Sequence, residues 1–175
     1  MQATSEHQSW LDTPLAAVMK VDWQRLLLIA LIFLAVITRL WDLSYRAWNH
    51  DEAIHTDWSW NLYTGRGYQH NPIYHGPLLY HLTALSFFLL GDNDTTARLP
   101  NALFGIVLVA LPYLFRKWLG RRGWVAVAAM LLISPALVYY SLFNRHDIYV
   151  ELFVVLLALA IWKYLDERKT TNNST

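Results

Sequence analysis

The chain has 175 residues, of which 55% are hydrophobic and 15% aromatic, and its formal charge is only +1. Because the apolar residues fall in long blocks, this composition predicts an all-α integral membrane protein and argues against a soluble domain. The chain contains no cysteine, which excludes disulfides, zinc–thiolate sites and iron–sulfur clusters.

The first apolar run follows a polar or mixed segment, residues 1–20, and no small-residue cleavage pattern follows the run. We therefore expect a cytoplasmic N-terminal segment at residues 1–20 and a retained membrane anchor after it. Four runs have the length of a membrane span, which is about 17 to 25 mainly apolar residues. They are Val21–Trp41, Leu99–Phe115, Trp124–Tyr140 and Ile148–Leu165.

A fifth apolar run, Pro77–Leu90, begins with proline and has only about 14 residues. This length favours a short interfacial helix over a span. We therefore predict about four transmembrane helices in a module at residues 21–165, with the short helix in a first external loop at residues 42–98. A cytoplasmic polar tail, residues 166–175, follows the module.

The distribution of basic residues favours this topology. If Pro77–Leu90 does not cross, then Lys20, Arg25, the segment RKWLGRR at 116–122 and the segment DERK at 166–169 all lie on one side, as the positive-inside rule requires. If it does cross, residues 116–122 move to the opposite side. The rule therefore predicts that both termini are cytoplasmic.

The same topology places two acidic segments on the external face. The stretch WNHDEAIH, residues 48–55, contains Asp51 and Glu52, and the stretch SLFNRHD, residues 141–147, ends in Asp147. Adjacent residues of a helix point about 100° apart. We therefore expect one carboxylate of the Asp51–Glu52 pair to face a site and the other to orient it.

A structural interpretation of these charges stays open beside the functional one. Glu151 lies one helical turn beyond Asp147, just inside the last predicted span, where a charge is costly unless it is paired or hydrated. Local salt bridges to Arg145, Arg98 or Arg39 would also account for the acidic residues.

The external loop also contains many aromatic residues. The stretch DEAIHTDWSWNLY, residues 51–63, has helical character and would lie along the lipid headgroups, where Trp and Tyr are frequent. Anchoring at the interface explains these residues, and stacking on a sugar or gripping a lipid is the alternative.

Histidines near Glu52 suggest a divalent metal ion as one further interpretation. The candidate ligands are Glu52 with His50, His55, His70 and His75. Histidines scattered over a loop surface are the commoner explanation of such a group. No other cofactor is evident, and the absence of histidine from the four predicted spans argues against haem bound within them.

Four stretches, in order and spacing, resemble the N-terminal part of the GT-C membrane glycosyltransferases. They are the Asp-Glu pair after the first apolar run, HGPLLYHLTALSFFLLG, ARLPNALFGIVLVALPYLFRKWLGRRG and SPALVYYSLFNRHD. The chain is most similar to the dolichyl-phosphate-mannose-protein mannosyltransferase and aminoarabinose transferase type, and within it to prokaryotic proteins with an HDEA loop. The likeness runs from about Leu26 to Ile161.

The resemblance implies a polyprenyl-phosphate sugar donor taken from the outer leaflet of a prokaryotic plasma membrane. It also implies that Asp51, with Glu52 beside it, is the catalytic base or site organiser, and that Asp147 is a second catalytic acid. Arg145 would hold the donor phosphate, and the substrate-binding candidates are Arg145, His146 and His55.

Two departures from the family pattern shape the expected function. Leu142 stands where relatives commonly have arginine, and the chain ends after its fourth predicted span, whereas family enzymes continue with further spans. We therefore expect a truncated, non-catalytic accessory or structural subunit of a larger membrane complex. The alternative is a glycosyltransferase module completed by an oligomer or a partner chain. The expected partners are the lipid bilayer, other membrane-protein subunits and a polyprenyl-phosphate lipid, with no nucleic acid among them.

Overall fold

The computed structural model describes residues 22–67 and 76–172, and every regular element within these ranges is a helix. The elements are α2 (Trp23–Leu40), α3 (His50–Tyr63), α4 (Leu78–Leu90), α5 (Asp94–Ala110), the 3-10 helix η3 (Leu111–Phe115), α6 (Arg116–Ile133), α7 (Pro135–Ser141) and α8 (Asp147–Asn172). The prediction of an all-α protein is confirmed for these residues.

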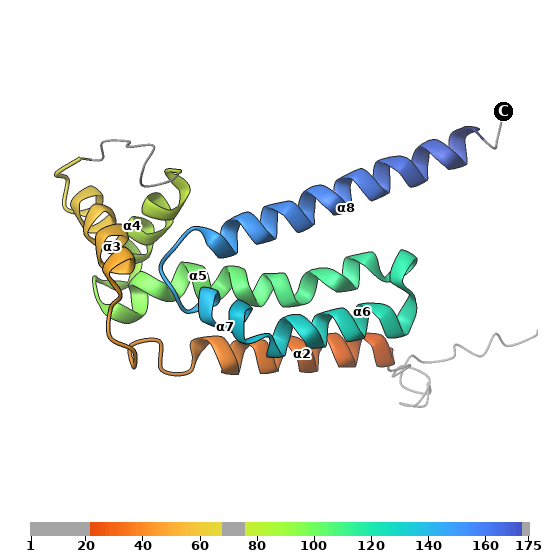
Figure 1. Cartoon of the computed structure of the whole chain (residues 1–175), viewed down its shortest axis with the longest axis horizontal. Helices are drawn as coiled ribbons and strands as arrows, with labels where there is room; N and C mark the ends of the chain where they lie inside the picture. Colours follow the sequence, from red (N-terminus) through yellow and green to blue (C-terminus); the bar gives the residue numbers. More distant parts are fainter. Residues whose placement is uncertain (1–21, 68–75, 173–175) are drawn as a thin grey trace, which may run out of the picture.

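The helices form a bundle with a smaller pair across one end (Figure 1). Helices α2, α5 and α6 pack side by side, and α8 packs on α5, α7 and η3. Helices α3 and α4 pack against each other and lie across the end where α2 finishes and α5 begins. Within the predicted external loop, His50–Tyr63 and Leu78–Leu90 therefore make a compact helical pair.

Among the described residues, three helical segments are long and apolar enough to cross a membrane: Trp23–Leu40, Asp94–Ile133 and Asp147–Asn172. The second contains 40 residues, but it is not one straight helix. Gly120 has φ 68° and ψ 177°, a conformation that favours glycine, and α6 runs back beside α5 (Figure 1). The chain therefore reverses direction within this segment.

One predicted span is divided in the structure. The run Trp124–Tyr140 was expected to be one helix, but α6 ends at Ile133 and α7 begins at Pro135. Proline lacks a backbone N–H and disfavours the helical conformation at the residue before it, so Ser134 leaves the helical conformation, with φ −59° and ψ 119°. The short run Pro77–Leu90 does form a separate helix, α4, which Gly91 ends at φ 85°.

The basic segments gather at the end of the bundle opposite α3 and α4. Helix α2 begins, α6 begins and α8 ends there (Figure 1). Lys117 of α6 forms an ion pair with Asp166 of α8. Nearby, Trp118 and Trp162 stack with their ring centroids 6.0 Å apart. The described basic segments of α2, α6 and α8 therefore lie at one end of the bundle.

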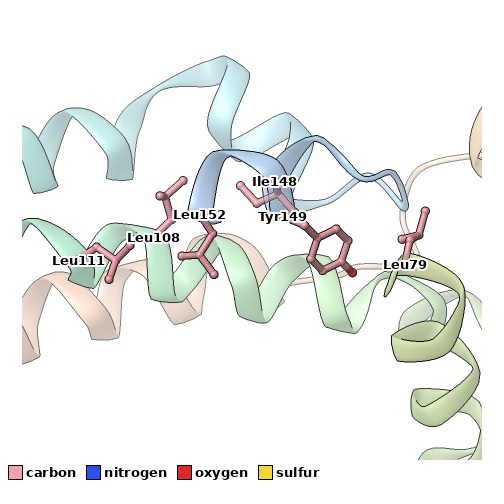
Figure 2. Packing of buried hydrophobic residues seen from close by; sticks show 6 residues of the cluster. All are labelled: Leu79, Leu108, Leu111, Ile148, Tyr149 and Leu152. Atoms are coloured by element: carbon pink, nitrogen blue, oxygen red, sulfur yellow. The ribbon is translucent and has the colours of Figure 1, made fainter. Parts of the chain in front are cut away.

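A hydrophobic core joins the helical pair to the bundle (Figure 2). Its buried residues come from α4, α5, η3 and α8, and they are Leu79, Leu108, Leu111, Ile148, Tyr149 and Leu152. Outward-facing apolar side chains, among them Phe33 of α2 and Phe153 of α8, are at least half exposed. An apolar exterior is suited to contact with lipid, so the fold is that of an integral membrane protein.

Candidate functional site

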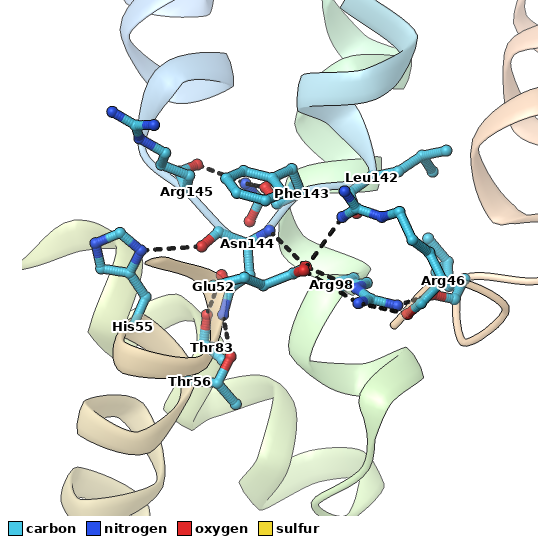
Figure 3. A network of polar contacts seen from close by, with 12 residues as sticks. Arg46, Glu52, His55, Thr56, Thr83, Arg98, Leu142, Phe143, Asn144 and Arg145 are labelled. Atoms are coloured by element: carbon cyan, nitrogen blue, oxygen red, sulfur yellow. Dashed lines mark hydrogen bonds and ion pairs between the residues drawn. The ribbon is translucent and has the colours of Figure 1, made fainter. Parts of the chain in front are cut away.

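Glu52, in the first turn of α3, forms a fully buried ion pair with Arg98 of α5 (Figure 3). The pair is bidentate, with Arg98 Nε 2.7 Å from Glu52 Oε1 and Nη2 3.1 Å from Oε2. Arg98 also donates hydrogen bonds to the carbonyl oxygens of Leu43 and Arg46, at 2.6 and 3.0 Å. One charged pair thus connects α3, α5 and the segment that follows α2.

Two further donors complete the surroundings of Glu52. Nη2 of Arg46 lies 3.2 Å from Oε2, and the backbone N–H of Asn144 donates to Oε1 at 3.1 Å. The Glu52 side chain has no exposed surface. These contacts are those of a residue that positions the loop between α7 and α8.

The side chain of Asn144 anchors this loop to the helical pair. Its Nδ2 donates to Thr56 Oγ1 at 2.8 Å, and its Oδ1 accepts from Thr83 Oγ1 at 3.3 Å. Nδ1 of His55 lies 3.2 Å from the Asn144 carbonyl oxygen, so a proton on Nδ1 would make it the donor. His55 is almost completely buried.

Asn101 of α5 holds the same loop from the bundle side. Its Nδ2 donates to the carbonyl oxygens of Phe143 and Arg145, at 2.7 and 2.6 Å. Its Oδ1 accepts from the Tyr149 hydroxyl at 2.8 Å. The loop that carries Arg145 is therefore fixed through buried hydrogen bonds on both sides.

Asp51 and Asp147 converge on the guanidinium of Arg145. Oδ2 of Asp51 lies 3.4 Å from Nη1, and Oδ2 of Asp147 lies 3.2 Å from Nε. The Asp51 side chain is 50% exposed, whereas that of Asp147 is 29% exposed. Two carboxylates and one guanidinium give this group a formal charge of −1, with an accessible carboxylate at Asp51.

The structure therefore separates the two neighbouring acids in the way expected for an adjacent pair on a helix. Asp51 is exposed and Glu52 is buried. Salt bridges to two of the predicted arginines are present: Asp51 and Asp147 pair with Arg145, and Glu52 pairs with Arg98. Arg39 instead donates to the carbonyl oxygen of Leu131, at 3.0 Å, and no described carboxylate lies within ion-pair distance of it.

The remaining predicted residues lie at the edge of this site. His146, which lies between Arg145 and Asp147 in the sequence, is partly buried. Glu151, one helical turn after Asp147 in α8, is also partly buried. Their roles stay predictions.

Sequence reasoning did not select Arg46, Asn101 or Asn144. Asn101 carried a usable signal, because a polar residue within an apolar run needs a buried partner. Arg46 and Asn144 lie in polar loop segments, where such residues are ordinary, so their sequence positions carried no comparable signal.

A divalent metal ion also stays a prediction. Residues 22–67 and 76–172 contain no group of three or more His, Asp or Glu side chains that could hold one. His70 and His75, two of the proposed ligands, lie outside the described residues. The positive charge that lies between the carboxylates of Asp51 and Asp147 is the guanidinium of Arg145.

These observations define a helical integral membrane protein with a charged site at one end of its bundle. A model of the family described as dolichyl-phosphate-mannose-protein mannosyltransferase matches residues 74–172, more than half of the chain, and the chain belongs to that family. The match includes Arg98, Asn101 and the whole loop from α7 to α8, but it begins after α3. Comparison with curated proteins and with solved structures gave no match.

Proposed function

We propose that the chain is a glycosyltransferase module that uses a polyprenyl-phosphate sugar as donor, with Asp51 as the general base. The observation that carries the proposal is the convergence of Asp51 and Asp147 on Arg145, since Asp51 and Arg145 are 94 residues apart in the chain. Membership of a mannosyltransferase family supports the reaction class.

In the proposed reaction, the acceptor hydroxyl gives its proton to Asp51 while its oxygen attacks the anomeric carbon of the donor sugar. The bond between that carbon and the phosphate oxygen breaks, and the polyprenyl phosphate leaves. Asp51 is suited to the base role because its carboxylate is half exposed. Arg145 orients the two carboxylates, and Glu52 acts as a positioning residue through its contacts with the loop.

We place this module in the plasma membrane of a prokaryote with four crossings and both termini cytoplasmic. The reversal at Gly120 supports counting α5 and α6 as separate crossings. The positive-inside rule supports a cytoplasmic location for the end where α2 and α6 begin and α8 ends (Figure 1), because Arg25, Lys117 and Lys169 lie in the corresponding turns of these helices. The charged site then lies at the external boundary of the membrane, where a lipid-linked sugar is available.

The proposal is tested by replacing Asp51 with asparagine. The purified chain is incubated with a panel of polyprenyl-phosphate sugars, beginning with dolichyl-phosphate-mannose, and the release of lipid phosphate is measured. Asp51→Asn should lower the rate by about 100-fold or more, the usual contribution of a general base. The control is Asp57→Asn, an exposed α3 acid that accepts a hydrogen bond from Asn61 and lies outside the site. Unchanged transfer by Asp51→Asn would exclude the proposed base.

A second candidate function is that of an accessory subunit of a larger membrane complex. The supporting observation is the apolar surface that α8 leaves uncovered, which includes Val150, Phe153, Val154, Leu157 and Ile161. Helices of another subunit would cover this apolar surface just as lipid chains would. Extraction in mild detergent, followed by measurement of mass and composition, distinguishes the candidates. Stoichiometric recovery with other subunits supports the accessory role, and recovery alone or as a homo-oligomer contradicts it.

A further inference from the structure

An open hollow of about 450 Å³ lies beside the charged site, between the end of α2, the segment that follows it, and α7. Its walls are mainly apolar and aromatic, and they include Trp41, Tyr45, Tyr139 and Leu142. Arg46 also lines the hollow. No residue predicted from the sequence to bind a substrate lines this hollow.

Arg46 uses only part of its hydrogen-bonding capacity. Its Nη2 donates to Glu52 Oε2 and to the Leu142 carbonyl oxygen, both at 3.2 Å. Within the described parts of the chain, no acceptor takes a hydrogen bond from its Nε or Nη1. The guanidinium carbon lies 5.0 Å from the ring centroid of Tyr139, and the side chain is 35% exposed. Arg46 is thus held in place with donors left over for a ligand.

The charges around Arg46 favour an anion. Glu52 is shared by two guanidinium groups, those of Arg98 and Arg46, so the three residues carry a formal charge of +1. Arg98 is fully buried and each of its nitrogens already donates to the protein. The excess positive charge is therefore accessible at Arg46.

Arg145, the phosphate contact suggested by the family resemblance, has the opposite surroundings. Its guanidinium lies between the carboxylates of Asp51 and Asp147. The formal charge of that group is −1, which disfavours a second anion. Electrostatics therefore select Arg46 over Arg145 as the contact for a phosphate.

The position of the hollow indicates what kind of anion it meets. Trp41 and Tyr45 are 77% and 86% exposed at the end of the α2 span, and such aromatic residues are typical of the boundary between membrane and water. Apolar walls beside a cation suit a molecule with a charged head and a hydrocarbon chain.

We propose that this hollow binds the phosphate group of a membrane lipid, with Arg46 as the cationic contact. The choice of a polyprenyl phosphate as that lipid rests on the proposed function, whereas an ordinary anionic phospholipid offers the same chemistry. Asp42 also lines the hollow, but it forms no ion pair with Arg46. Its charge opposes the bound anion.

The test measures lipid binding to the full chain by native mass spectrometry in a detergent with an uncharged sugar headgroup. The probes are polyprenyl phosphate, phosphatidylglycerol and, as the control without phosphate, polyprenol. Both phosphate lipids should bind more tightly than polyprenol. A preference for polyprenyl phosphate identifies the donor-type lipid, and equal affinities identify a general phospholipid site. Equal binding of polyprenol would overturn the proposal.

Variants test the role of Arg46. Arg46→Gln should weaken binding of the phosphate lipids about tenfold, the loss expected for a charge-assisted hydrogen bond. The matched control is Arg66→Gln, which removes an exposed arginine that stacks on Trp60 away from the hollow. A folded Arg46→Gln variant with unchanged affinity, or a loss seen only in Arg145→Gln, would overturn the proposal.

Asp42→Asn tests the site without disturbing the contacts of Arg46. Removal of the opposing charge should tighten binding several-fold, and unchanged or weaker binding contradicts the proposal even if Arg46→Gln does not fold.

Transfer assays separate this inference from the proposed function. Lipid binding that depends on Arg46 in a chain without transferase activity would reject the function and keep the site. Transferase activity with binding that does not depend on Arg46 would do the reverse.

Discussion

Glu52 and Arg98 form a bidentate ion pair with no exposed surface, although they are 46 residues apart in the chain. The pair lies where α3, α5 and the loop between α7 and α8 meet. Because a buried charge is costly without its partner, this contact makes the placement of Asp51 dependent on the packing of the whole end of the bundle.

Removal of the Glu52 charge should destabilise the protein strongly. Glu52→Gln leaves the buried Arg98 without a counter-charge, so we expect the free energy of unfolding to fall by about 3 kcal/mol or more. The measurement is reversible unfolding in mixed detergent and dodecyl sulfate micelles, followed by circular dichroism. Arg46→Gln should cost much less, since Glu52 keeps Arg98 and Arg46 is partly exposed. Equal stability of Glu52→Gln and the wild type would show that the ion pair does not hold this end together.

Asn101 should be needed for the order of the loop that carries Arg145. Asn101→Leu removes the donors to the carbonyl oxygens of Phe143 and Arg145 and the acceptor for Tyr149. We expect a loss of about 1–3 kcal/mol in the free energy of unfolding, the cost of leaving buried polar groups unpaired. Hydrogen exchange of the amides at residues 142–146 should become faster. Asn61→Leu serves as the control and should leave that exchange unchanged, because the partly exposed Asn61 side chain donates to Asp57 within α3.

Close packing between α5 and α7 should make Gly105 intolerant of substitution. A Cβ at Gly105 would lie 2.6 Å from Ser141 Cβ and closer still to Ser141 Oγ. Gly105→Ala should therefore reduce stability by about 1–3 kcal/mol through overpacking. The double variant Gly105→Ala/Ser141→Gly should recover part of that loss, which a double-mutant cycle measures. At Gly76 an added Cβ meets no atom of the described residues within 4 Å, so Gly76→Ala should behave like the wild type.

The absence of cysteine makes the topology directly testable. Single cysteines at Asp57, Arg121 and Thr170, all exposed positions, can be labelled in intact cells with a maleimide that does not cross the membrane. With four crossings and cytoplasmic termini, only the cysteine at position 57 should react before the cells are lysed. Reaction at both positions 57 and 121 in intact cells would mean that α5 and α6 do not form a hairpin across the membrane.

Local sequence patterns predicted much of the helical architecture. The lengths of the apolar runs gave α2, α5 and α8 to within a few residues at their starts, and the short run at Pro77–Leu90 gave α4. The resemblance to a mannosyltransferase family, based on motifs in order, is confirmed by the match over residues 74–172. The break at Ser134 was missed because hydrophobicity continues across it, although Pro135 marks the position.

The sequence by itself determined that helices form, that their apolar surfaces suit a membrane, and that an Asp-Glu pair stands near the end of the first span. These properties depend on short runs of neighbouring residues, so they can be read locally. Only the tertiary structure decided that Asp51 is exposed while Glu52 is buried, and that Arg145 lies between two carboxylates while Arg46 shares one carboxylate with Arg98. The physical reason is that the environment of a charge depends on its partners, and two partners of Glu52, Arg98 and Asn144, are 46 and 92 residues away in the chain.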